Sequence, residues 1–280
     1  MLRIVVDLGN SRAKWGRLGP SGDLDDSIAL PIDGPVAWAE TWERWNPAGV
    51  ECSTWAVATV NPPAADRLDA FLQERGIRAA RWYRSAADVP LRHALERPET
   101  AGVDRACAVA AAVALHPGGG PGLVVSCGTA ITVDRIAADG TWQGGAIAPG
   151  LHLSARALHL LTAQLPEVDV SEAPPAWGPS TLSALAAGVF WGVVGSIREL
   201  LEQQAIGLPS ALSPRERVPE GRVRGFAFDE ETALSPSPWL LWTGGDAPTL
   251  APWVVGDHAH VVPDLVLQGL ARVAHGTTDR

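Results

Sequence analysis

The sequence predicts an α/β protein built from two related halves, and two observations lead to this prediction. Each half opens with a polar glycine turn between two apolar strands, and the turns are Asp7-Leu8-Gly9-Asn10-Ser11 and Ser126-Cys127-Gly128-Thr129-Ala130. After its turn, each half alternates strand-like with helix-like segments, which is typical of layered α/β domains. We therefore expect two domains, residues 1–121 and 122–280, with both glycine turns at one cleft between them.

The first half yields a series of elements from its hydrophobic pattern. Its apolar runs predict strands at residues 3–7, 14–18, 53–60 and 77–83. A helix is expected at 64–75, because Leu68, Phe71 and Leu72 share one face and Gly76 ends the pattern. An Ala-rich helix should begin near Val103 and stop before Pro117.

The second half repeats this alternation beyond the glycine-rich run at residues 118–122. Strands are expected at 123–125, 130–136, 142–147, 239–243 and 260–262, and helices at 151–164, 181–204, just after Asp246 and at 265–275. Residues 209–237 are rich in Pro, Ser and charge, so we expect a loosely ordered connection there.

Composition places the chain among soluble, cytoplasmic proteins. Its 280 residues are 46% hydrophobic and 19% charged, as in globular proteins, and apolar runs are broken before the roughly 20 residues that a bilayer requires. The net charge of −9 argues against nucleic-acid and anionic-membrane partners, which favour a basic face. Cys52, Cys107 and Cys127 lack CxxC spacing, which indicates reduced thiols.

The two glycine turns carry groups that suit a phosphate. Glycine lets backbone N–H groups approach phosphate oxygens closely, Lys14 adds a positive charge after the first turn, and Asp7 offers a carboxylate for Mg²⁺. Neutral donors are also present, and these are Asn10, Ser11, Thr129 and Thr132. The same residues would equally suit two ordinary β-hairpins, whose Asp and Asn side chains satisfy the turn backbone.

The segment Gly102-Val103-Asp104-Arg105 opens the Ala-rich helix and carries a second candidate function. Asp104 could take a proton from an attacking hydroxyl, and Arg105 could hold a carboxylate or phosphate through two hydrogen bonds. The alternative is structural, because an Asp in a first helical turn is stabilised by the helix dipole. The sequence contains no G-x-x-x-x-G-K-[ST] loop, G-x-S-x-G elbow or HExxH motif.

Taken together, these motifs resemble the type III pantothenate kinases, and the match runs nearly end to end. Its anchors are residues 7–11 with Lys14, 102–105, 128–134, Gly144-Gly145 through Pro149-Gly150, Thr181 with Gly188, 243–245 and 263–270. The resemblance implies two ribonuclease H-like domains of the actin, hexokinase and heat-shock chaperone type. It also implies a homodimer that phosphorylates pantothenate with ATP and Mg²⁺, with K⁺ or NH₄⁺ as a further cofactor.

The resemblance also assigns roles to residues of this chain. ATP would be held by Asp7, Leu8, Gly9, Asn10, Ser11, Arg12, Ala13, Lys14, Gly128, Thr129 and Thr132, with Asp7 also holding Mg²⁺. Pantothenate would be held by Leu95, Gly102, Val103, Asp104, Arg105 and Thr181, the last of them in the partner subunit. Asp104 would be the catalytic base.

The chain departs from the family pattern at two positions. Ser126 stands where many relatives have an Asp that binds the monovalent cation, and Leu95 stands where relatives commonly have a Tyr near the substrate. These departures motivate an alternative, a catalytically weak regulatory or accessory protein of the same fold. A sugar or acetate kinase is disfavoured, because those kinases lack the GxDR stretch in this place.

Overall fold

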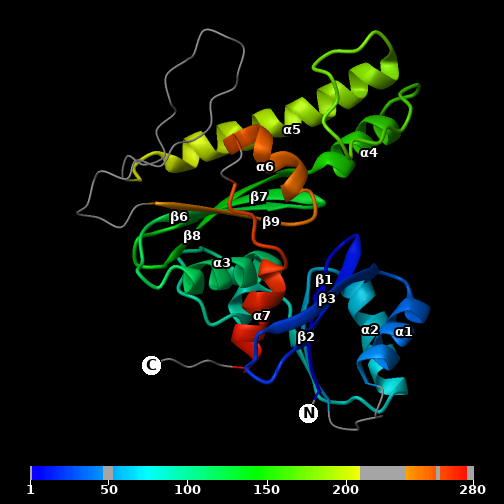
Figure 1. Cartoon of the computed structure of the whole chain (residues 1–280), viewed down its shortest axis with the longest axis vertical. Coiled ribbons are helices and arrows are strands. Elements are labelled where there is room, and N and C mark those ends of the chain that lie inside the picture. Colours follow the sequence, from blue (N-terminus) through cyan, green and yellow to red (C-terminus); the bar gives the residue numbers. More distant parts are fainter. Residues whose placement is uncertain (1, 47–52, 209–237, 257–258, 276–280) are drawn as a thin grey trace. The chain divides into compact units, whose positions relative to one another are not determined.

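The computed structural model describes residues 2–46, 53–208, 238–256 and 259–275, which divide into two compact units (Figure 1). Unit 1 comprises residues up to Leu91, Leu95–Leu115 and the chain from Asp264 onward. Unit 2 comprises Arg92–Ala94 and His116–Pro263. Both units contain a mixed β-sheet with helices, as the sequence predicts.

Unit 1 is built on a five-stranded sheet in the order β3-β2-β1-β4-β5. The strands are β1 (Leu2–Leu8), β2 (Arg12–Leu18), β3 (Leu24–Pro31), β4 (Ser53–Thr59) and β5 (Ala80–Tyr83). The first three strands are antiparallel, whereas β4 and β5 run parallel to β1. Its helices are α1 (Pro35–Trp45), α2 (Pro62–Glu74), α3 (Val103–Leu115) and α7 (Leu265–His275), with short helices η1 (Ala86–Asp88) and η2 (Pro98–Thr100).

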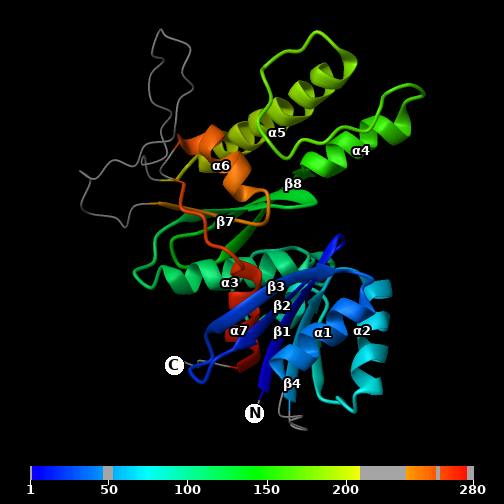
Figure 2. The ribbon, with the colours of Figure 1, turned by 45° about the vertical axis from the view of Figure 1, so that its right-hand side comes forward.

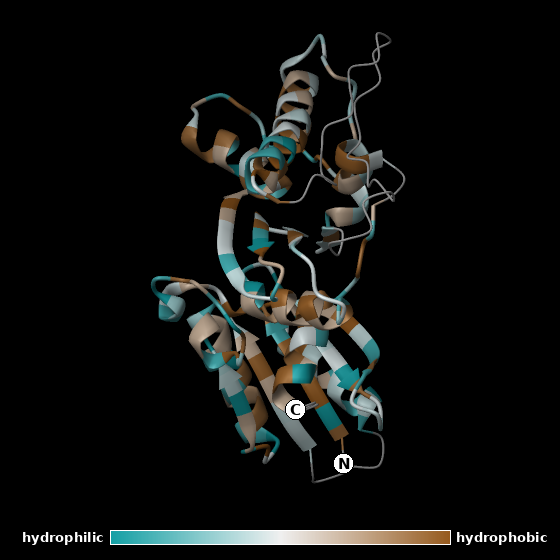
Figure 3. Cartoon of the chain, turned by 90° about the vertical axis from the view of Figure 1, so that its left-hand side faces the viewer, coloured by the Kyte–Doolittle hydropathy of each residue, from teal (hydrophilic) through white to brown (hydrophobic). Residues whose placement is uncertain are grey.

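The helices of unit 1 cover the two faces of this sheet in pairs, α1 and α2 on one face and α3 and α7 on the other (Figure 2). The central strands β1 and β4 carry continuous runs of buried residues, as expected where helices cover both faces of a sheet, and Figure 3 colours the chain by hydropathy. Trp15, Trp38 and Trp55 pack with Phe71 between the sheet and the α1–α2 pair. Trp45 belongs to the same cluster, so four of the twelve Trp residues are buried in a single core.

The C-terminal helix α7 belongs to unit 1, which differs from the expected division at residue 121. Leu267 is fully buried and approaches Gly16 of β2, where an added Cβ would lie 3.3 Å from its Cδ1. A Cβ on Gly269 would meet the backbone of Cys107 in α3 at 1.9 Å. Because Gly269 has no side chain, the backbones of α7 and α3 can approach each other closely, and the two helices form one layer.

Unit 2 repeats the strand order of unit 1, in a four-stranded sheet β8-β7-β6-β9. The strands are β6 (Gly122–Cys127), β7 (Ala130–Ile136), β8 (Trp142–Pro149) and β9 (Trp239–Thr243), and the helices are α4 (Leu151–Leu161), α5 (Thr181–Ala205) and α6 (Ala247–Val255). Side chains from all three helices form one core with the sheet, around the fully buried Phe190 and Trp242. The residues expected as a strand at 260–262 form a single bridge, between Val261 and Trp242.

For two further segments, the structure differs from what their sequence suggests. The structure adds β3, which the sequence analysis did not predict. Asp25, Asp26 and Ser27 make the first half of this strand polar, so the sequence lacks an apolar run there. By length and composition α5 could cross a bilayer, yet its buried residues lie in the core of unit 2. The connection expected at 209–237 and Cys52 lie outside the described residues.

Candidate functional site

The first glycine turn joins β1 to β2 and is held by the loop that follows β4. Within the turn, the Gly9 N–H donates to the Arg12 carbonyl at 3.1 Å. Asn61 caps α2 by accepting a hydrogen bond from the Ala64 N–H, and its side-chain amide also donates to the Gly9 carbonyl at 3.4 Å. Asn10, the residue at the tip, is exposed. The turn is therefore positioned from behind while its tip faces solvent.

Four charged residues from different elements of unit 1 interact around the base of this turn. Asp7 lies on β1 directly opposite Lys14 on β2, Asp104 is in the first turn of α3, and Asp264 immediately precedes α7. Burial and the carboxylates of Asp104 and Asp264 together raise the pKa of Asp7 to about 7, against the opposing charge of Lys14. The charged groups that shift the Asp7 pKa are thus two carboxylates and one lysine.

Asp104 has a defined orientation at the start of α3. Its Oδ1 accepts a hydrogen bond from the Arg105 N–H at 2.9 Å. Gly102 leaves room for this carboxylate, because an added Cβ there would lie 2.4 Å from the Asp104 Oδ1. A carboxylate that is partly buried and held beside Asp7 can accept a proton from a bound hydroxyl.

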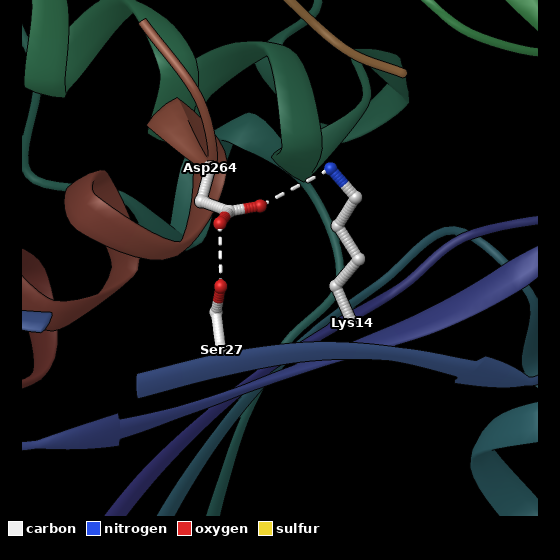
Figure 4. Close-up of polar contacts among 3 residues, drawn as sticks. All are labelled: Lys14, Ser27 and Asp264. Carbon is white, nitrogen blue, oxygen red and sulfur yellow. Dashed lines mark hydrogen bonds and ion pairs between the residues drawn. The ribbon is translucent and has the colours of Figure 1, made fainter. Parts of the chain in front are cut away.

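Lys14 makes its ion pair with Asp264 rather than with Asp7 (Figure 4). The Lys14 ammonium lies 3.3 Å from Asp264 Oδ1, and the Ser27 hydroxyl donates to the other carboxylate oxygen at 2.7 Å. Ser27 lies on β3, the strand that the sequence analysis missed. Sequence reasoning gave Asp264 and Ser27 no role, because no local spacing connects them to Lys14.

The second glycine turn, in unit 2, is shorter and is fixed by backbone contacts. The Gly128 N–H donates to the Ala130 carbonyl at 3.1 Å. Added Cβ atoms on Gly150 and Gly244 would meet the turn backbone at 2.1 Å, on Gly128 and Cys127 respectively. Thr129 is exposed at the tip, where its hydroxyl and N–H can reach a ligand.

Near the second turn, unit 2 has two carboxylates, Asp246 beside Cys127 and the hydrogen-bonded Asp134. Ser126 pairs with Thr132 in the β6–β7 register. The Thr132 hydroxyl donates to Asp134 at 3.2 Å, and the Trp142 indole N–H donates to the same carboxylate at 2.9 Å. Asp134 is fully buried, so these two donors compensate for the lost hydration of its charge.

The predicted site residues divide between the two units. The structure brings Asp7, Lys14 and Asp104 together in unit 1, along with Arg105 and the first turn. Gly128, Thr129, Thr132, Ser126 and Thr181 belong to unit 2, and Thr181 is exposed at the start of α5. Leu95 lies in the irregular segment before η2 and is partly buried.

Two cysteines of the described chain lie close to these sites and are chemically inert. Cys107 and Cys127 are fully buried, and burial raises the pKa of both thiols far above neutral. Nearby Asp7 and Asp104 raise the Cys107 pKa further. A buried, protonated thiol is neither a nucleophile nor a metal ligand, so Cys127 contributes packing to the second turn.

The repeated strand order and paired glycine turns define an α/β protein of the actin and hexokinase class. A Baf family protein from Campylobacter jejuni has a similar crystal structure, with TM-score 0.54 and 20% identity over 97% of each chain. The ethanolamine utilization protein EutJ from Carboxydothermus hydrogenoformans matches 98% of this chain and 90% of its own, with TM-score 0.50 and 15% identity. Both likenesses concern the fold.

The particular family follows from the sequence comparisons. The model of the type III pantothenate kinase family matches residues 3–203. The type III pantothenate kinase of Nitrosococcus oceani is 30% identical over 98% of this chain and 94% of its own, and that of Alkalilimnicola ehrlichii is 34% identical over 97% of each. The chain belongs to the type III pantothenate kinase family, which confirms the resemblance seen in its motifs.

Proposed function

We propose that this protein transfers the γ-phosphoryl group of ATP to the primary hydroxyl of pantothenate, the first step of coenzyme A biosynthesis. The observation that carries the proposal is the grouping of Asp104, Asp7 and Lys14 in unit 1 of a chain from this family. In this proposal, Asp104 is the proton acceptor and Lys14 the phosphate-binding cation, both near the first glycine turn.

In the proposed reaction, Asp104 accepts the proton of the pantothenate hydroxyl. At the same time, the oxygen of that hydroxyl forms a bond to the γ-phosphorus of ATP. The bond from that phosphorus to the β–γ bridging oxygen breaks, and ADP leaves with 4′-phosphopantothenate as the second product. Lys14 and the backbone of residues 8–13 hold phosphate oxygens, and Gly128 and Thr129 do so from unit 2. Phosphoryl transfer depends mainly on such positioning and charge neutralisation.

Asp7 is the residue that fits a magnesium ion. Its carboxylate shares its surroundings with two others and one lysine, and a cation would relieve this excess negative charge. Across the described part of the chain, no group of three or more His, Cys, Asp or Glu residues could hold a metal alone. This suits Mg²⁺, which commonly takes one or two protein carboxylates and completes its shell with phosphates and water. Bound Mg²⁺ would supply neutralisation of the phosphate charge.

A monovalent cation has weaker support in this chain. Ser126 offers a neutral hydroxyl, and the nearby carboxylate of Asp134 is already bonded to Trp142 and Thr132. We therefore expect similar turnover in potassium, ammonium and sodium salts. A steep requirement for potassium would show that other groups of unit 2 replace the missing carboxylate.

For pantothenate itself, we propose binding by Gly102–Arg105, with Arg105 holding the substrate carboxylate through two hydrogen bonds. Leu95 would give its part of the pocket an apolar wall in place of the family's tyrosine. Thr181 would contribute from the partner subunit of a homodimer.

The homodimer is supported by exposed apolar side chains on α4, the segment after it and the start of α5. They include Leu160, Leu161, Trp177 and Leu182, of which Leu161 is 84% and Trp177 82% exposed. Because α4 packs against α5, these residues share one region of unit 2, and such patches commonly mark protein interfaces. Analytical ultracentrifugation tests the dimer.

A small-molecule kinase of this kind is expected in the cytoplasm.

The direct test is a coupled kinase assay with purified protein, MgATP and pantothenate, with identification of 4′-phosphopantothenate. Asp104→Asn should lower kcat by about 10²–10⁴ and leave nucleotide affinity nearly unchanged, because a general base acts in the chemical step. Unchanged turnover in this variant would remove Asp104 from the base role. Nucleotide binding by calorimetry without any turnover in the wild type would favour a regulatory or accessory protein.

A further inference from the structure

Asp264 occupies an unusual backbone position at the point where the chain re-enters unit 1. Its φ of 54° is the one positive value among the described non-glycine residues, and Pro263, the last residue of unit 2, precedes it. Asp and Asn tolerate this left-handed conformation better than most residues, although it remains unfavourable. The Asp264 carbonyl accepts the Gln268 N–H at 3.0 Å, so this bent residue also begins the hydrogen bonding of α7.

The carboxylate of Asp264 is held from two sides. The Ser27 hydroxyl donates to one oxygen at 2.7 Å, and the close packing of Leu267 on Gly16 and of Gly269 on Cys107 fixes the helix behind it. Its other oxygen faces the Lys14 ammonium at 3.3 Å (Figure 4). A side chain anchored to β3 and to a packed helix is a rigid point from which a flexible group can be oriented.

Lys14 is a group that requires such orientation. Its ammonium ends a four-carbon stem with many rotamers, and 29% of its side chain is exposed. Asp7, directly across from it on β1, offers a competing carboxylate. Without a fixed partner, the ammonium would divide its time between Asp7 and solvent, and binding a phosphate would carry the entropy cost of ordering it.

We propose that Asp264 is a positioning residue that, together with Ser27, holds the Lys14 ammonium in place for the nucleotide phosphates. The inference rests on the proposed function in one respect, that Lys14 binds ATP phosphates. An ammonium has three hydrogens, so it can keep Asp264 as a partner and donate to a phosphate oxygen at the same time.

Loss of the Asp264 carboxylate should change nucleotide affinity in the direction opposite to that expected from charge repulsion alone. Removing a carboxylate near an anion site should strengthen binding of ATP or ADP if charge alone mattered. If Asp264 orients Lys14, its removal should instead weaken nucleotide binding. A purely structural role for Asp264 would change stability and leave the affinity of the folded protein unaltered.

The test is calorimetric titration of the wild type and Asp264→Asn with MgADP and with a non-hydrolysable MgATP analogue. We expect Kd to rise by about tenfold, since misplacement of one binding group commonly has effects of this order or larger. Asparagine tolerates the same φ and is nearly the same size, so the fold should persist. Asp264→Gly, which relieves the backbone and also lacks the carboxylate, should show the same loss.

A double-mutant cycle isolates the coupling between the two residues. Lys14→Ala should weaken nucleotide binding, and adding Asp264→Asn to it should cause little further loss, because no ammonium remains to be oriented. Ser27→Ala should weaken binding by a smaller factor. Equal or tighter binding by Asp264→Asn, or independent losses in the double variant, would overturn the proposal.

The chain provides a matched control on the same strand. Arg17, also on β2, pairs with Asp25 at 2.7 Å, and both side chains are more exposed than Lys14 and Asp264. Asp25→Asn should leave nucleotide Kd unchanged. Because the readout is nucleotide affinity, a wild type that binds nucleotide but does not phosphorylate pantothenate would refute the proposed function while the test of Asp264 still stands.

Discussion

The two glycine turns of this protein share one scaffold and differ in how charge is handled beside them. In both units a mixed sheet of the same strand order places the turn between its first two strands. In unit 1 burial, together with the neighbouring carboxylates, raises the pKa of Asp7. In unit 2 the carboxylate of Asp134 is fully buried and accepts hydrogen bonds from Trp142 and Thr132.

In the function proposed above, this difference would distinguish a reactive site in unit 1 from a supporting one in unit 2. Crowded carboxylates destabilise a fold, yet they attract Mg²⁺ and can accept protons, so they are useful where chemistry occurs. A satisfied carboxylate contributes rigidity and has no spare capacity for a ligand. Under the proposed function, the repeated scaffold would support catalysis in unit 1 and a fixed phosphate loop in unit 2.

The loops that support the turns differ in a corresponding way. After β4, the Asn61 side chain reaches the carbonyl of Gly9. After β9, the backbone itself approaches, with Gly244 against Cys127 and the Asp246 N–H donating to the Cys127 carbonyl at 3.1 Å. One turn is held by a side chain and the other by direct contact between backbones.

The largest expected effect comes from breaking the backbone contact in unit 2. Gly244→Ala should lower the free energy of unfolding by about 2–4 kcal/mol, because its φ is +95° and the new Cβ would meet the Cys127 carbonyl oxygen. Urea denaturation measures this loss. The adjacent Gly245→Ala is the control, since no atom lies within 4 Å of its added Cβ. Equal losses in both variants would contradict the backbone-contact interpretation.

The second effect is a gain in stability on replacing Asp7 by Asn, and this gain should depend on pH. The native pKa of Asp7 is about 7, above its unfolded value near 3.8, so the native state binds the extra proton between these pH values. The wild type therefore loses stability as pH rises from about 4 to about 7. In metal-free buffer, Asp7→Asn should be more stable by about 1–3 kcal/mol at pH 8, a difference that shrinks toward pH 4.

A companion variant in unit 2 should show the opposite sign. Asp134→Asn should destabilise the protein at pH 8 by about 1–3 kcal/mol, because it weakens two hydrogen bonds to a buried charge. Thermal unfolding of both variants across pH 4–8 measures the contrast. Stabilisation by both substitutions would show that the two carboxylates are equally strained.

The smallest effect should come from loosening the turn of unit 1. Asn61→Ala removes the cap of α2 and the contact with Gly9, and should cost about 1 kcal/mol. Because the first turn would lose its support, KM for MgATP should also rise. Asn61→Asp keeps a capping oxygen without the amide donor. Its stability should therefore be close to that of the wild type, while its KM for MgATP should stay nearly as high as in Asn61→Ala. Full recovery of both would assign the kinetic effect to the helix alone.

Sequence alone predicted most of the strands and helices, because their hydrophobic periods are strong and glycine or proline marks their ends. It missed β3, since an edge strand with Asp25, Asp26 and Ser27 on it lacks that apolar signal. It grouped α7 with the second half, because local periodicity carries no information on which sheet a helix covers. At the candidate site, the motifs pointed to Asp7, Lys14 and Asp104, whose roles stay predictions, whereas Asp264 and Asn61 make their contacts between segments distant in sequence.

The return of α7 to unit 1 has a consequence for the order in which the chain can fold. During synthesis, nearly all of unit 2, His116–Pro263, leaves the ribosome before the last helix of unit 1 does. Until α7 emerges, β2 lacks Leu267, α3 lacks its partner at Gly269, and Lys14 lacks Asp264. The contacts of α7 with β2 and α3 close a long stretch of sequence, so we expect them to form late, and with them the ion pair between Asp264 and Lys14.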